Sequence, residues 1–406
     1  MGERVTVLVT GGEHFGGLAA ARALVRAGFK TVVAVTTESS YAAKSRAASG
    51  RVLVPDPALG AEPFAEALAE ASETFAADVV LPGTDVGLSA LAAYRDRFPD
   101  RVAVGVCDPE TVERATSKAA LAALGSAAGI AVPATQTIAR ADLAGSKPIE
   151  ITFPAVVKTL RSDVVDAGGT LVHAGAFRVR DAEQLAEIVE GLPGERWVVQ
   201  PYLEGDLVAV GGVASDGALV AAVHQVAERI WPLDCGGSSY AMTIPPDPAR
   251  EQRVRRFVAE LGWTGIFQLQ VLRRGDEEFL IDFNPRFYGT LGLALAAGVN
   301  LPRLWVQLLL GRTPQPLATY KVGVRYRAQL NDTRAIAALA QSGSWREAAR
   351  GLLPVRRTCH PVVAWNDPLP VLAGWKRVRR KVAAATEKST RCSPRRPEVD
   401  KPSRKS

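Results

Sequence analysis

Short apolar segments alternate with alanine-rich helical segments through residues 1–106. The apolar segments read VTVLVT, TVVAVT, RVLV, DVVLP and RVAVGV. Strands separated by helices are typical of a parallel sheet with helices packed on it. We therefore expect the N-terminal part of the chain, 1–113, to be a parallel α/β domain.

The pattern changes after ETVERATSKAALAALGSAAGIAVP, which predicts helices ending at Gly129. From FPAVVK to IDFNPRF the strands are longer, glycine-containing turns separate them, and only two helices are clear, at 181–191 and 247–262. This mixture is α+β, and it predicts a second domain at 114–313. Weaker patterning predicts a small C-terminal addition at 314–385 and a basic disordered tail at 386–406.

The net charge of +7 is concentrated at the C-terminal end. Residues 376–406 hold 12 Lys or Arg against three acids, which is +9, so the remainder carries 7 minus 9, or −2. The simplest interpretation is a solvated basic end, and contact with an anionic surface or nucleic acid is the alternative. Because the body lacks this charge, we do not expect it to bind nucleic acid.

Other features of the whole chain indicate a cytoplasmic protein. No apolar run reaches the roughly 20 residues that span a bilayer, and MGERVTVLVTGG has no apolar signal-peptide region. The four cysteines are scattered, which suggests reduced thiols. We expect small-molecule partners and no membrane partner, and a homodimer is left open.

Four glycines lie in VTGGEHFGG, after the first apolar segment. Their positions do not match the dinucleotide-binding pattern G-x-G-x-x-G, and the second strand ends AVTTESS, without an acid to hold a ribose. Backbone N–H groups at the following helix start could bind an anion. A tight structural turn, an anionic-substrate site and a cofactor site are the three interpretations.

Lys158 ends the run FPAVVK and precedes a polar loop that contains Gly168 and Gly169. Glycine amides approach phosphate oxygens closely and lysine supplies a point charge, so this combination suits phosphate. A lysine that only reaches solvent is the alternative. Gln200, in RWVVQPYLEGD, can donate and accept hydrogen bonds as an adenine edge requires, although an ordinary strand end also explains it.

The stretch GIFQLQVLRRGDEEFLIDFNPRF predicts a β-hairpin that turns at residues 275–277. A turn centred on Asp276 sets Gln270 opposite Asp282. Side chains alternate between the faces of a strand, so Asn284 shares their face. Three oxygen donors on one face suit a hard cation that also accepts phosphate oxygens, Mg²⁺ or Mn²⁺.

An acid in an apolar strand needs compensation for its charge. In FLIDFNPRF, a bound metal would supply that compensation for Asp282. Pro285 ends the strand, and Arg286 can then reach over the site toward an anion.

Taken in order, Lys118, Lys158, the loop at 168–169, VVQPYLEG, and GIFQLQV followed by FLIDFNPRF resemble the ATP-grasp superfamily. The nearest likeness is to its carboxylate–amine ligases and to the synthetase domains of carbamoyl-phosphate synthase. LIDFNPRF is the most specific motif. The resemblance covers residues 1–312 and implies a Rossmann-like pre-ATP-grasp domain at 1–113 and a two-lobed ATP-grasp domain at 114–313.

The resemblance also implies a set of nucleotide-binding residues. These are Lys118, Lys158, Gly168, Gly169, Gln200, Tyr202, Leu203 and Asp206. The two lysines would contact the ATP phosphates, and the glycines would belong to the loop that covers them. Gln200 would face the adenine amino group and Leu203 would contact the ring edge through its backbone, while Asp206 is a weaker candidate for the ribose hydroxyls.

For the metal and the substrates, the resemblance implies two further groups. Gln270, Asp282 and Asn284 would hold Mg²⁺ or Mn²⁺. Arg286 would steady the substrate carboxylate or the acyl phosphate, and Arg229, before WPLDCGGSSY, would join the phosphate or substrate site together with Lys158.

Several positions depart from the usual family pattern. Gln200 stands where many members have glutamate, and Gln270 and Asp282 stand where two glutamates are common, so the metal site has one carboxylate fewer. The phosphate loop is poorer in glycine than usual. Gln and Asp both occur in the family, which favours weaker or second-metal-dependent binding over loss of function.

The function implied is an ATP-dependent carboxylate–amine ligase that forms an acyl phosphate and releases ADP and phosphate. A non-catalytic nucleotide sensor would explain the thinner metal site, whereas an oxidoreductase lacks its fingerprint. We expect the acid and amine pockets in N-terminal loops such as PGTDVGLSAL, with Asp85, and in the C-terminal addition. The pair Cys359–His360 is interpreted as structural.

Overall fold

The structure is a computed structural model that describes residues 4–144, 150–160, 163–165, 171–173, 175–314, 319–353, 355 and 357–373. Its first part is a five-stranded parallel sheet with the order β3-β2-β1-β4-β5. The strands are β1 (Thr6–Val9), β2 (Lys30–Val35), β3 (Gly50–Leu53), β4 (Val79–Leu81) and β5 (Ala103–Val104). The predicted parallel α/β sheet is therefore confirmed, with all five strands at the apolar segments.

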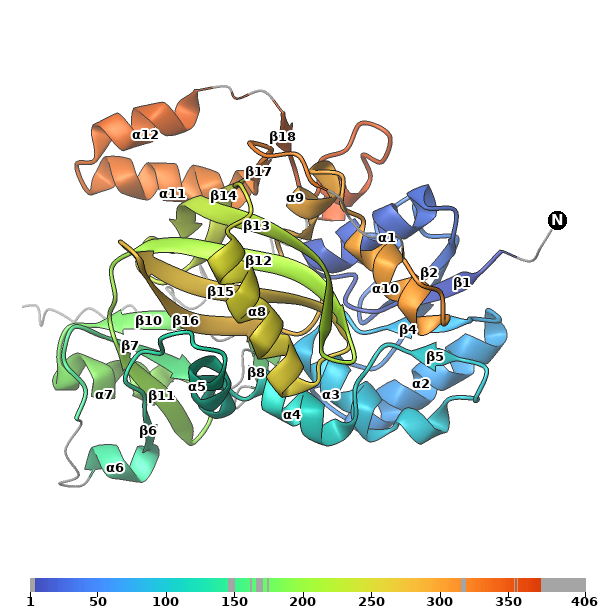
Figure 1. Ribbon diagram of the computed structural model, residues 1–406, viewed down its shortest axis with the longest axis horizontal. Coiled ribbons are helices and arrows are strands. Elements are labelled where there is room, and N and C mark those ends of the chain that lie inside the picture. Colours follow the sequence, from blue (N-terminus) through green and yellow to red (C-terminus); the bar gives the residue numbers. More distant parts are fainter. Residues whose placement is uncertain are drawn as a thin grey trace, which may run out of the picture.

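Helices pack on both faces of this sheet (Figure 1). Val7 and Val9 of β1 pack in one cluster with helix α1 (Phe15–Arg26), whereas Leu8 packs on the other face with α2 (Ala61–Thr74) and α3 (Asp85–Ala93). This alternation explains why Val7, Leu8 and Val9 are apolar in succession: both faces of β1 are buried. Two short 3-10 helices complete this part, η1 (Ala42–Lys44) and η2 (Arg95–Arg97).

Two further sheets form the middle of the chain. The smaller has the order β10-β7-β11-β6 and the larger has seven strands in the order β16-β15-β12-β13-β14-β17-β18. The smaller sheet consists of β6 (Gln136–Ala139), β7 (Ala155–Thr159), β10 (Ala176–Val179) and β11 (Arg196–Pro201). The larger consists of β12 (Asp206–Ser215), β13 (Ala218–Trp231), β14 (Gly237–Thr243), β15 (Gly265–Arg274), β16 (Glu277–Asn284), β17 (Arg325–Arg327) and β18 (Thr358–Cys359).

All pairings in these sheets are antiparallel except β17 with β18. A separate antiparallel pair joins β8 (Asp163–Val165) to β9 (Leu171–His173). The helices that precede and accompany the smaller sheet are α4 (Pro109–Thr116), α5 (Lys118–Ala127), α6 (Arg140–Ala144) and α7 (Ala182–Gly191). The boundary that we expect near residue 113 falls inside α4.

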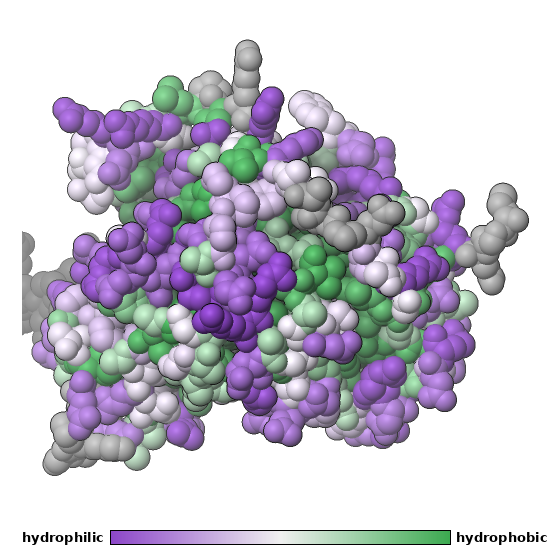
Figure 2. Space-filling model, in the orientation of Figure 1, coloured by the Kyte–Doolittle hydropathy of each residue, from purple (hydrophilic) through white to green (hydrophobic). Residues whose placement is uncertain are grey.

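Helix α8 (Pro248–Leu261) crosses one face of the larger sheet (Figure 1). Asp247 caps its first turn by accepting a hydrogen bond from the backbone N–H of Arg250. Val254, Phe257 and Val258 are fully buried against the sheet, while the outer surface of the helix is hydrophilic (Figure 2). Such an amphipathic helix buries one apolar stripe and leaves the rest in water.

The opposite face of the larger sheet meets the N-terminal sheet and its helices. Val213, Val223 and Ile266 pack there in one cluster with α1, α9 (Leu291–Ala296) and α10 (Leu301–Leu309). Gly16 in α1 allows this approach, because a Cβ at that position would lie 2.8 Å from the backbone oxygen of Tyr288. Close packing therefore accounts for this glycine of the N-terminal motif, which favours its structural interpretation.

The C-terminal part adds two helices, α11 (Gln329–Gln341) and α12 (Trp345–Leu352), as an antiparallel pair at one end of the larger sheet (Figure 1). The chain then returns through β18 toward the N-terminal domain, where Asp367 pairs with Arg22 of α1. No helix within the described ranges combines the length and apolarity needed to cross a bilayer.

Candidate functional site

The hairpin of β15 and β16 brings the predicted metal-binding residues together. Gln270 pairs directly with Asp282 across the ladder, and Asn284 lies two residues further along β16. Because side chains alternate along each strand, all three side chains belong to the face that meets the N-terminal domain. The predicted pairing of Gln270 with Asp282 is confirmed.

The route to this pairing differs from the predicted one. The turn is the two-residue loop Gly275–Asp276 between the paired residues Arg274 and Glu277, and that loop alone would set Gln270 opposite Ile281. A β-bulge at Ile281 adds one residue to β16 and moves Asp282 into the opposing position. The bulge therefore aims the acid into the site.

A chain of amides supports this face and was not predicted from the sequence. Gln270 Nε2 donates to Gln268 Oε1 at 3.3 Å, and Gln268 Nε2 donates to Thr290 Oγ1 at 2.9 Å. Gln225 of the neighbouring strand β13 also donates to Thr290 Oγ1, at 2.8 Å. The strand register could have predicted the position of Gln268. It lies two residues before Gln270, on the same face of β15, and pairs with Asn284.

Lys118 approaches Asp282 from the first turn of α5. Ser117 caps this helix by accepting a hydrogen bond from Ala120 N, and Lys118 Nζ lies 3.6 Å from Asp282 Oδ1. Helix α5 packs closely on β16 because Gly125 has no side chain; a Cβ there would lie 2.8 Å from Leu280 Cδ2. The charge of the acid is therefore offset by Lys118 within the chain itself.

Lys158 comes from the smaller sheet, on β7, and faces the same site. Its Nζ donates to Gln200 Oε1 at 3.3 Å and to the backbone oxygen of Ile281 at 3.5 Å, so the bulged residue supplies one of its partners. Gln200 Nε2 in turn donates to Thr135 Oγ1 at 2.9 Å. Burial, and then the neighbouring charge of Lys118, lowers the pKa of Lys158 from 10.5 to about 8.

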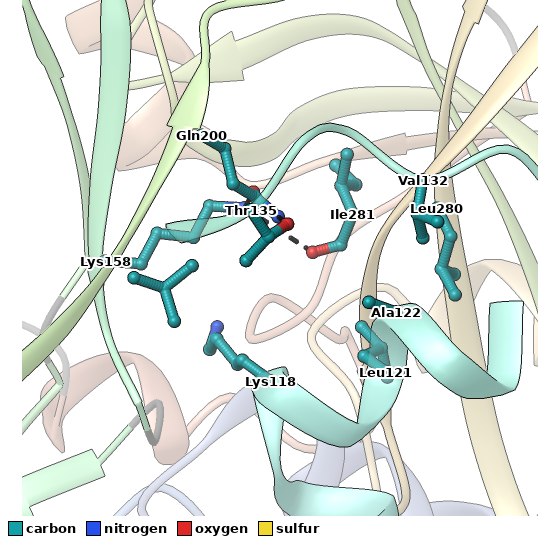
Figure 3. Close-up of a pocket in the computed structure, with 10 residues that line it drawn as sticks. Lys118, Leu121, Ala122, Val132, Thr135, Lys158, Gln200, Leu280 and Ile281 are labelled. Carbon is teal, nitrogen blue, oxygen red and sulfur yellow. Dashed lines mark hydrogen bonds between the residues drawn. The ribbon is translucent and has the colours of Figure 1, made fainter. Parts of the chain in front are cut away.

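Two cavities adjoin at Lys118. The first lies between the smaller sheet and α5, with Lys158, Gln200 and Thr135 pointing into it together with apolar side chains (Figure 3). Its lining residues are Lys118, Leu121, Ala122, Val132, Thr135, Lys158, Val198, Gln200, Leu280 and Ile281. The second is lined by Asp85, Ala115, Thr116, Ser117, Lys118, Leu121, Asp282 and Phe283.

Arg286 binds Asp85, one of the residues that line the second cavity. Its Nε and Nη2 donate to the two carboxylate oxygens of Asp85 at 2.9 and 3.1 Å, and Nη2 also donates to Asn284 Oδ1 at 3.0 Å. Asp85 lies at the start of α3, whose N-cap is Thr84. This pair joins the N-terminal domain to the hairpin. The role of Asp85 in an acid or amine pocket stays a prediction.

The other residues predicted to bind the nucleotide lie in different parts of the structure. Tyr202 packs under the guanidinium of Arg178, whose Cζ lies 4.2 Å from the ring centroid, and Leu203 follows in the connection to β12. Asp206 pairs with Arg273 at 2.6 Å, and alternation along β12 sets it on the face opposite to that of Gln270 and Asp282. The loop with Gly168 and Gly169 lies outside the described residues. The ribose and adenine contacts stay predictions.

Arg229 lies in a different cluster, at the far end of β13. Its Nε donates to Asp332 Oδ1 at 2.7 Å, and its guanidinium stacks on Tyr240 with 4.3 Å from Cζ to the ring centroid. Arg327 binds the second oxygen of the same buried carboxylate at 2.6 Å. Arg229 lines neither of the two cavities, and its role toward phosphate or substrate stays a prediction.

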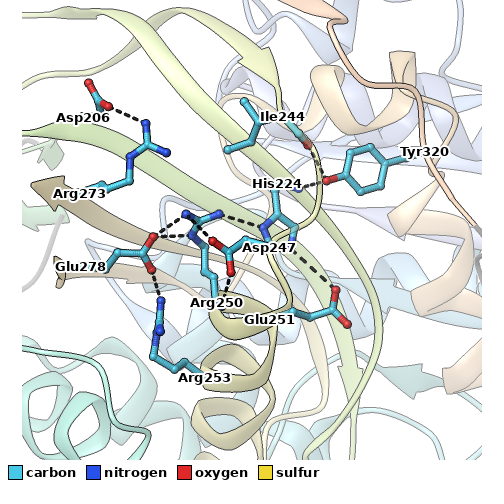
Figure 4. A network of polar contacts seen from close by, with 10 residues as sticks. All are labelled: Asp206, His224, Ile244, Asp247, Arg250, Glu251, Arg253, Arg273, Glu278 and Tyr320. Atoms are coloured by element: carbon cyan, nitrogen blue, oxygen red, sulfur yellow. Dashed lines mark hydrogen bonds and ion pairs between the residues drawn. The ribbon is translucent and has the colours of Figure 1, made fainter. Parts of the chain in front are cut away.

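On the opposite face of the hairpin from Gln270, Asp282 and Asn284, a buried polar network ties β16 to α8 (Figure 4). Glu278 accepts from Arg250 Nε at 2.7 Å and from Arg253 Nη2 at 2.6 Å. Arg250 Nη1 also donates to His224 Nδ1 at 3.3 Å. Burial, and then the charge of Arg250, lowers the pKa of His224 from 6.5 to about 4. The network fixes the strand that carries Asp282.

The oxygen atoms of Gln270, Asp282 and Asn284 are of the type that binds a hard cation, although the three side chains carry only one negative charge. Gln270, Asp282 and Asn284 offer amide and carboxylate oxygens on one face, which are ligands that Mg²⁺ and Mn²⁺ accept. Asp282 is the single acid among them, and the described ranges contain no cluster of three His, Cys, Asp or Glu side chains. A cation here would need phosphate oxygens to complete its coordination and balance its charge.

A family model described as "ATP-grasp in the biosynthetic pathway with Ter operon" matches residues 194–331. The matched part begins just before β11 and ends within α11, so it contains the hairpin with Gln270 and Asp282. Over this part, the chain is similar to an ATP-grasp family. No curated protein sequence matches it.

Solved structures share the ATP-grasp fold over most of this chain at low identity. An L-amino acid ligase from Bacillus licheniformis is 16% identical, with a TM-score of 0.56 over 78% of this chain and 76% of that one. N5-carboxyaminoimidazole synthetase from Staphylococcus aureus, complexed with ADP, is 12% identical, with a TM-score of 0.59 over 79% and 80%.

The biotin carboxylase domain of a Hydrogenobacter thermophilus 2-oxoglutarate carboxylase is 14% identical, with a TM-score of 0.60 over 80% of this chain and 74% of that one. That domain was solved with MgADP, ADP and bicarbonate. At these identities the likeness shows the fold, and it agrees with the predicted ATP-grasp architecture.

Proposed function

We propose that this protein is an ATP-dependent ligase that joins a carboxylate to an amine through an acyl phosphate. The observation that carries the proposal is the meeting of the two cavities at Lys118. Lys158 and Gln200 line one side, and Asp85 and Asp282 line the other. A nucleotide whose base occupies the first cavity would bring its terminal phosphate to the mouth of the second.

Charge and position supply the catalysis in this proposal. Lys118 and Lys158 would offset the charge of the terminal phosphates, and Arg286 would hold the substrate carboxylate beside them. A carboxylate oxygen attacks the γ-phosphorus, a new O–P bond forms, and the bond to the β–γ bridging oxygen breaks to release ADP. Mg²⁺ held by Gln270, Asp282 and Asn284 would add positive charge next to the phosphates.

In the second half-reaction an amine nitrogen attacks the acyl carbon, the C–O bond to phosphate breaks, and inorganic phosphate leaves with its electron pair. The ammonium form of the substrate must first give one proton to solvent, because only the free amine has the lone pair for this attack. Asp85 lies in the second cavity, within reach of the Arg286 guanidinium, and would attract the ammonium form of the substrate to the site.

The sharpest test is to screen carboxylates against amines for ADP release, with Lys158→Gln and Arg274→Gln measured in parallel. Arg274 is a matched control, because it pairs with the exposed Glu277 at the far end of the same hairpin. We expect turnover that Lys158→Gln abolishes and Arg274→Gln preserves. Turnover unaffected by Lys158→Gln would contradict the assignment of this site.

A non-catalytic nucleotide sensor is the second candidate, and one observation favours it. The cationic groups are already paired, Lys118 with Asp282 and Arg286 with Asp85. ATP binding without ADP release across all acid–amine combinations would support this candidate over the ligase.

A further inference from the structure

The three oxygen-bearing side chains on the hairpin differ in the partners that their oxygens already have. Asp282 Oδ1 lies 3.6 Å from Lys118 Nζ. Asn284 Oδ1 accepts a hydrogen bond from Arg286 at 3.0 Å. Gln270 donates through Nε2, whereas its Oε1 accepts from no donor within the described ranges of the chain. The side-chain oxygen of Gln270 is therefore open to a cation.

The amide of Gln270 is held in this orientation by a chain of buried side chains. Gln268, Thr290 and Gln225 are 4%, 6% and 3% exposed. A threonine hydroxyl oxygen has two lone pairs. Those of Thr290 accept from Gln225 Nε2 at 2.8 Å and from Gln268 Nε2 at 2.9 Å. With both lone pairs filled, Thr290 is the acceptor at the end of the chain.

The direction of this chain determines which end of Gln270 is left for a ligand. Because the nitrogen of Gln268 donates to Thr290, its Oε1 points the other way and accepts from Gln270 Nε2 at 3.3 Å. The nitrogen of Gln270 is thereby engaged, and its oxygen is left for the strand face that Asp282 shares. The reverse orientation would present an N–H donor, which cannot bind a cation.

We propose that Gln268 and Thr290 are positioning residues that orient Gln270 as a cation ligand. The inference rests on the proposed function, because it concerns how the chain holds Mg²⁺ or Mn²⁺ in that site. A carboxylate needs no such support, since either of its oxygens can bind a cation, whereas an amide binds through its oxygen only. The buried chain therefore supplies the orientation that a glutamine at position 270 requires.

A purely structural role is the alternative, in which these hydrogen bonds only join β15 to β13 and to the start of α9. The two roles differ in one measurable respect. A structural chain would matter equally whichever side chain stands at position 270. An orienting chain would matter to an amide there and not to a carboxylate.

The test is Mn²⁺ binding to the full chain in the presence of ADP, followed by the electron paramagnetic resonance signal of free Mn²⁺. The variants are Gln268→Met, which removes the amide at similar volume, Gln270→Glu, and the two combined. Gln341→Met makes the same change at an exposed residue at the end of α11 and is the matched control. Circular dichroism checks each fold; if Gln268→Met does not fold, Thr290→Val removes the acceptor at similar volume and takes its place.

We expect Gln268→Met to lower the affinity for Mn²⁺ at least about tenfold in the wild-type background. The same substitution should leave the affinity of Gln270→Glu unchanged, and the control should bind as wild type does. Wild-type affinity in Gln268→Met would overturn the inference. An equal loss of affinity in both backgrounds would also overturn it, because that result indicates the structural role.

Asp282→Asn, measured in the same way, separates this inference from the proposed function. An affinity that falls in Asp282→Asn and stays at the wild-type value in Gln268→Met would overturn the inference alone. Absence of Mn²⁺ binding to wild type, or binding that Asp282→Asn leaves unchanged, would overturn the metal site and the inference together.

Discussion

The guanidinium of Arg286 donates two hydrogen bonds to the carboxylate of Asp85, at 2.9 and 3.1 Å. The acid begins helix α3 of the N-terminal domain, and the arginine follows β16 of the larger sheet. The pair therefore holds two domains together beside the second cavity, which Asp85 lines. Arg286 is kept over Asn284, to which it also donates at 3.0 Å. A substrate carboxylate would share this guanidinium with Asp85 or displace it.

Asp85→Asn should weaken the contact between the domains. A hydrogen bond to a charged group contributes about 1.5–3 kcal/mol, so we expect the free energy of unfolding to fall by that amount. Asp85→Asn, Arg286→Gln and the double variant form a cycle measured by urea unfolding. A coupling energy near zero would show that the pair contributes nothing to the joining of the domains.

Asp282→Asn and Asn284→Ala should each lower turnover by orders of magnitude and leave the fold intact. Both side chains lie on the same strand face as Gln270 and outside the apolar clusters, so the substitutions remove charge and oxygen donors without removing core volume. Circular dichroism and thermal unfolding check the fold, and ADP release checks the function. Wild-type rates in either variant would rule out the metal assignment.

ATP affinity should fall as the pH rises above 8. The pKa of Lys158 is lowered to about 8 by burial, so above that pH the free protein loses the charge that would meet the phosphates. We expect the Kd for ATP, measured by calorimetry, to rise by up to about tenfold per pH unit above this value. The arginine in Lys158→Arg keeps its charge in this range, so the Kd of this variant for ATP should not change with pH. An equal rise of its Kd would show that a group other than Lys158 causes the pH dependence.

The same lysine affects stability with the opposite sign. Its pKa in the folded chain lies below the unfolded value of 10.5, so between pH 8 and that value the unfolded state binds the proton more strongly. The contribution of Lys158 to stability therefore rises with pH in this window.

Acid should destabilise the network behind the hairpin through His224. Its pKa is lowered from 6.5 to about 4, so the unfolded state binds more protons between these values, and stability is lost as the pH falls from 6.5 toward 4. The loss amounts to about 3 kcal/mol. His224→Gln retains an acceptor for Arg250 and should lack this part of the pH dependence of unfolding. Identical pH profiles in the two proteins would contradict the assignment.

Much of the fold could be predicted because local signals and tertiary structure agree. The helix predicted at 247–262 appears as Pro248–Leu261 with Asp247 as its N-cap, and the one predicted at 181–191 appears as Ala182–Gly191 with Asp181 as its cap. Short-range capping and hydrophobic period set such boundaries. The five N-terminal strands follow the same logic, since each is an apolar run between helices.

Only the part of the candidate site that lies on the hairpin of β15 and β16 could be predicted from the sequence. Gln270 and Asp282 are close in sequence, and their pairing follows from a turn, although the bulge at Ile281 was needed to correct it. The partner of Arg286, in contrast, is 201 residues away in sequence. No local sequence pattern predicts that Asp85 and Arg286 form an ion pair, or that Thr290 Oγ1 accepts hydrogen bonds from Gln225 and Gln268. These contacts arise from how whole domains pack.

The most direct test of the central claim uses the true acid substrate, once the ADP-release screen has found it, with ¹⁸O in its carboxylate. Attack of that carboxylate on the γ-phosphorus transfers one labelled oxygen to the phosphate when the amine displaces it. The account predicts labelled inorganic phosphate and ADP formed in step with the amide. AMP and pyrophosphate as products, or phosphate without label, would contradict it.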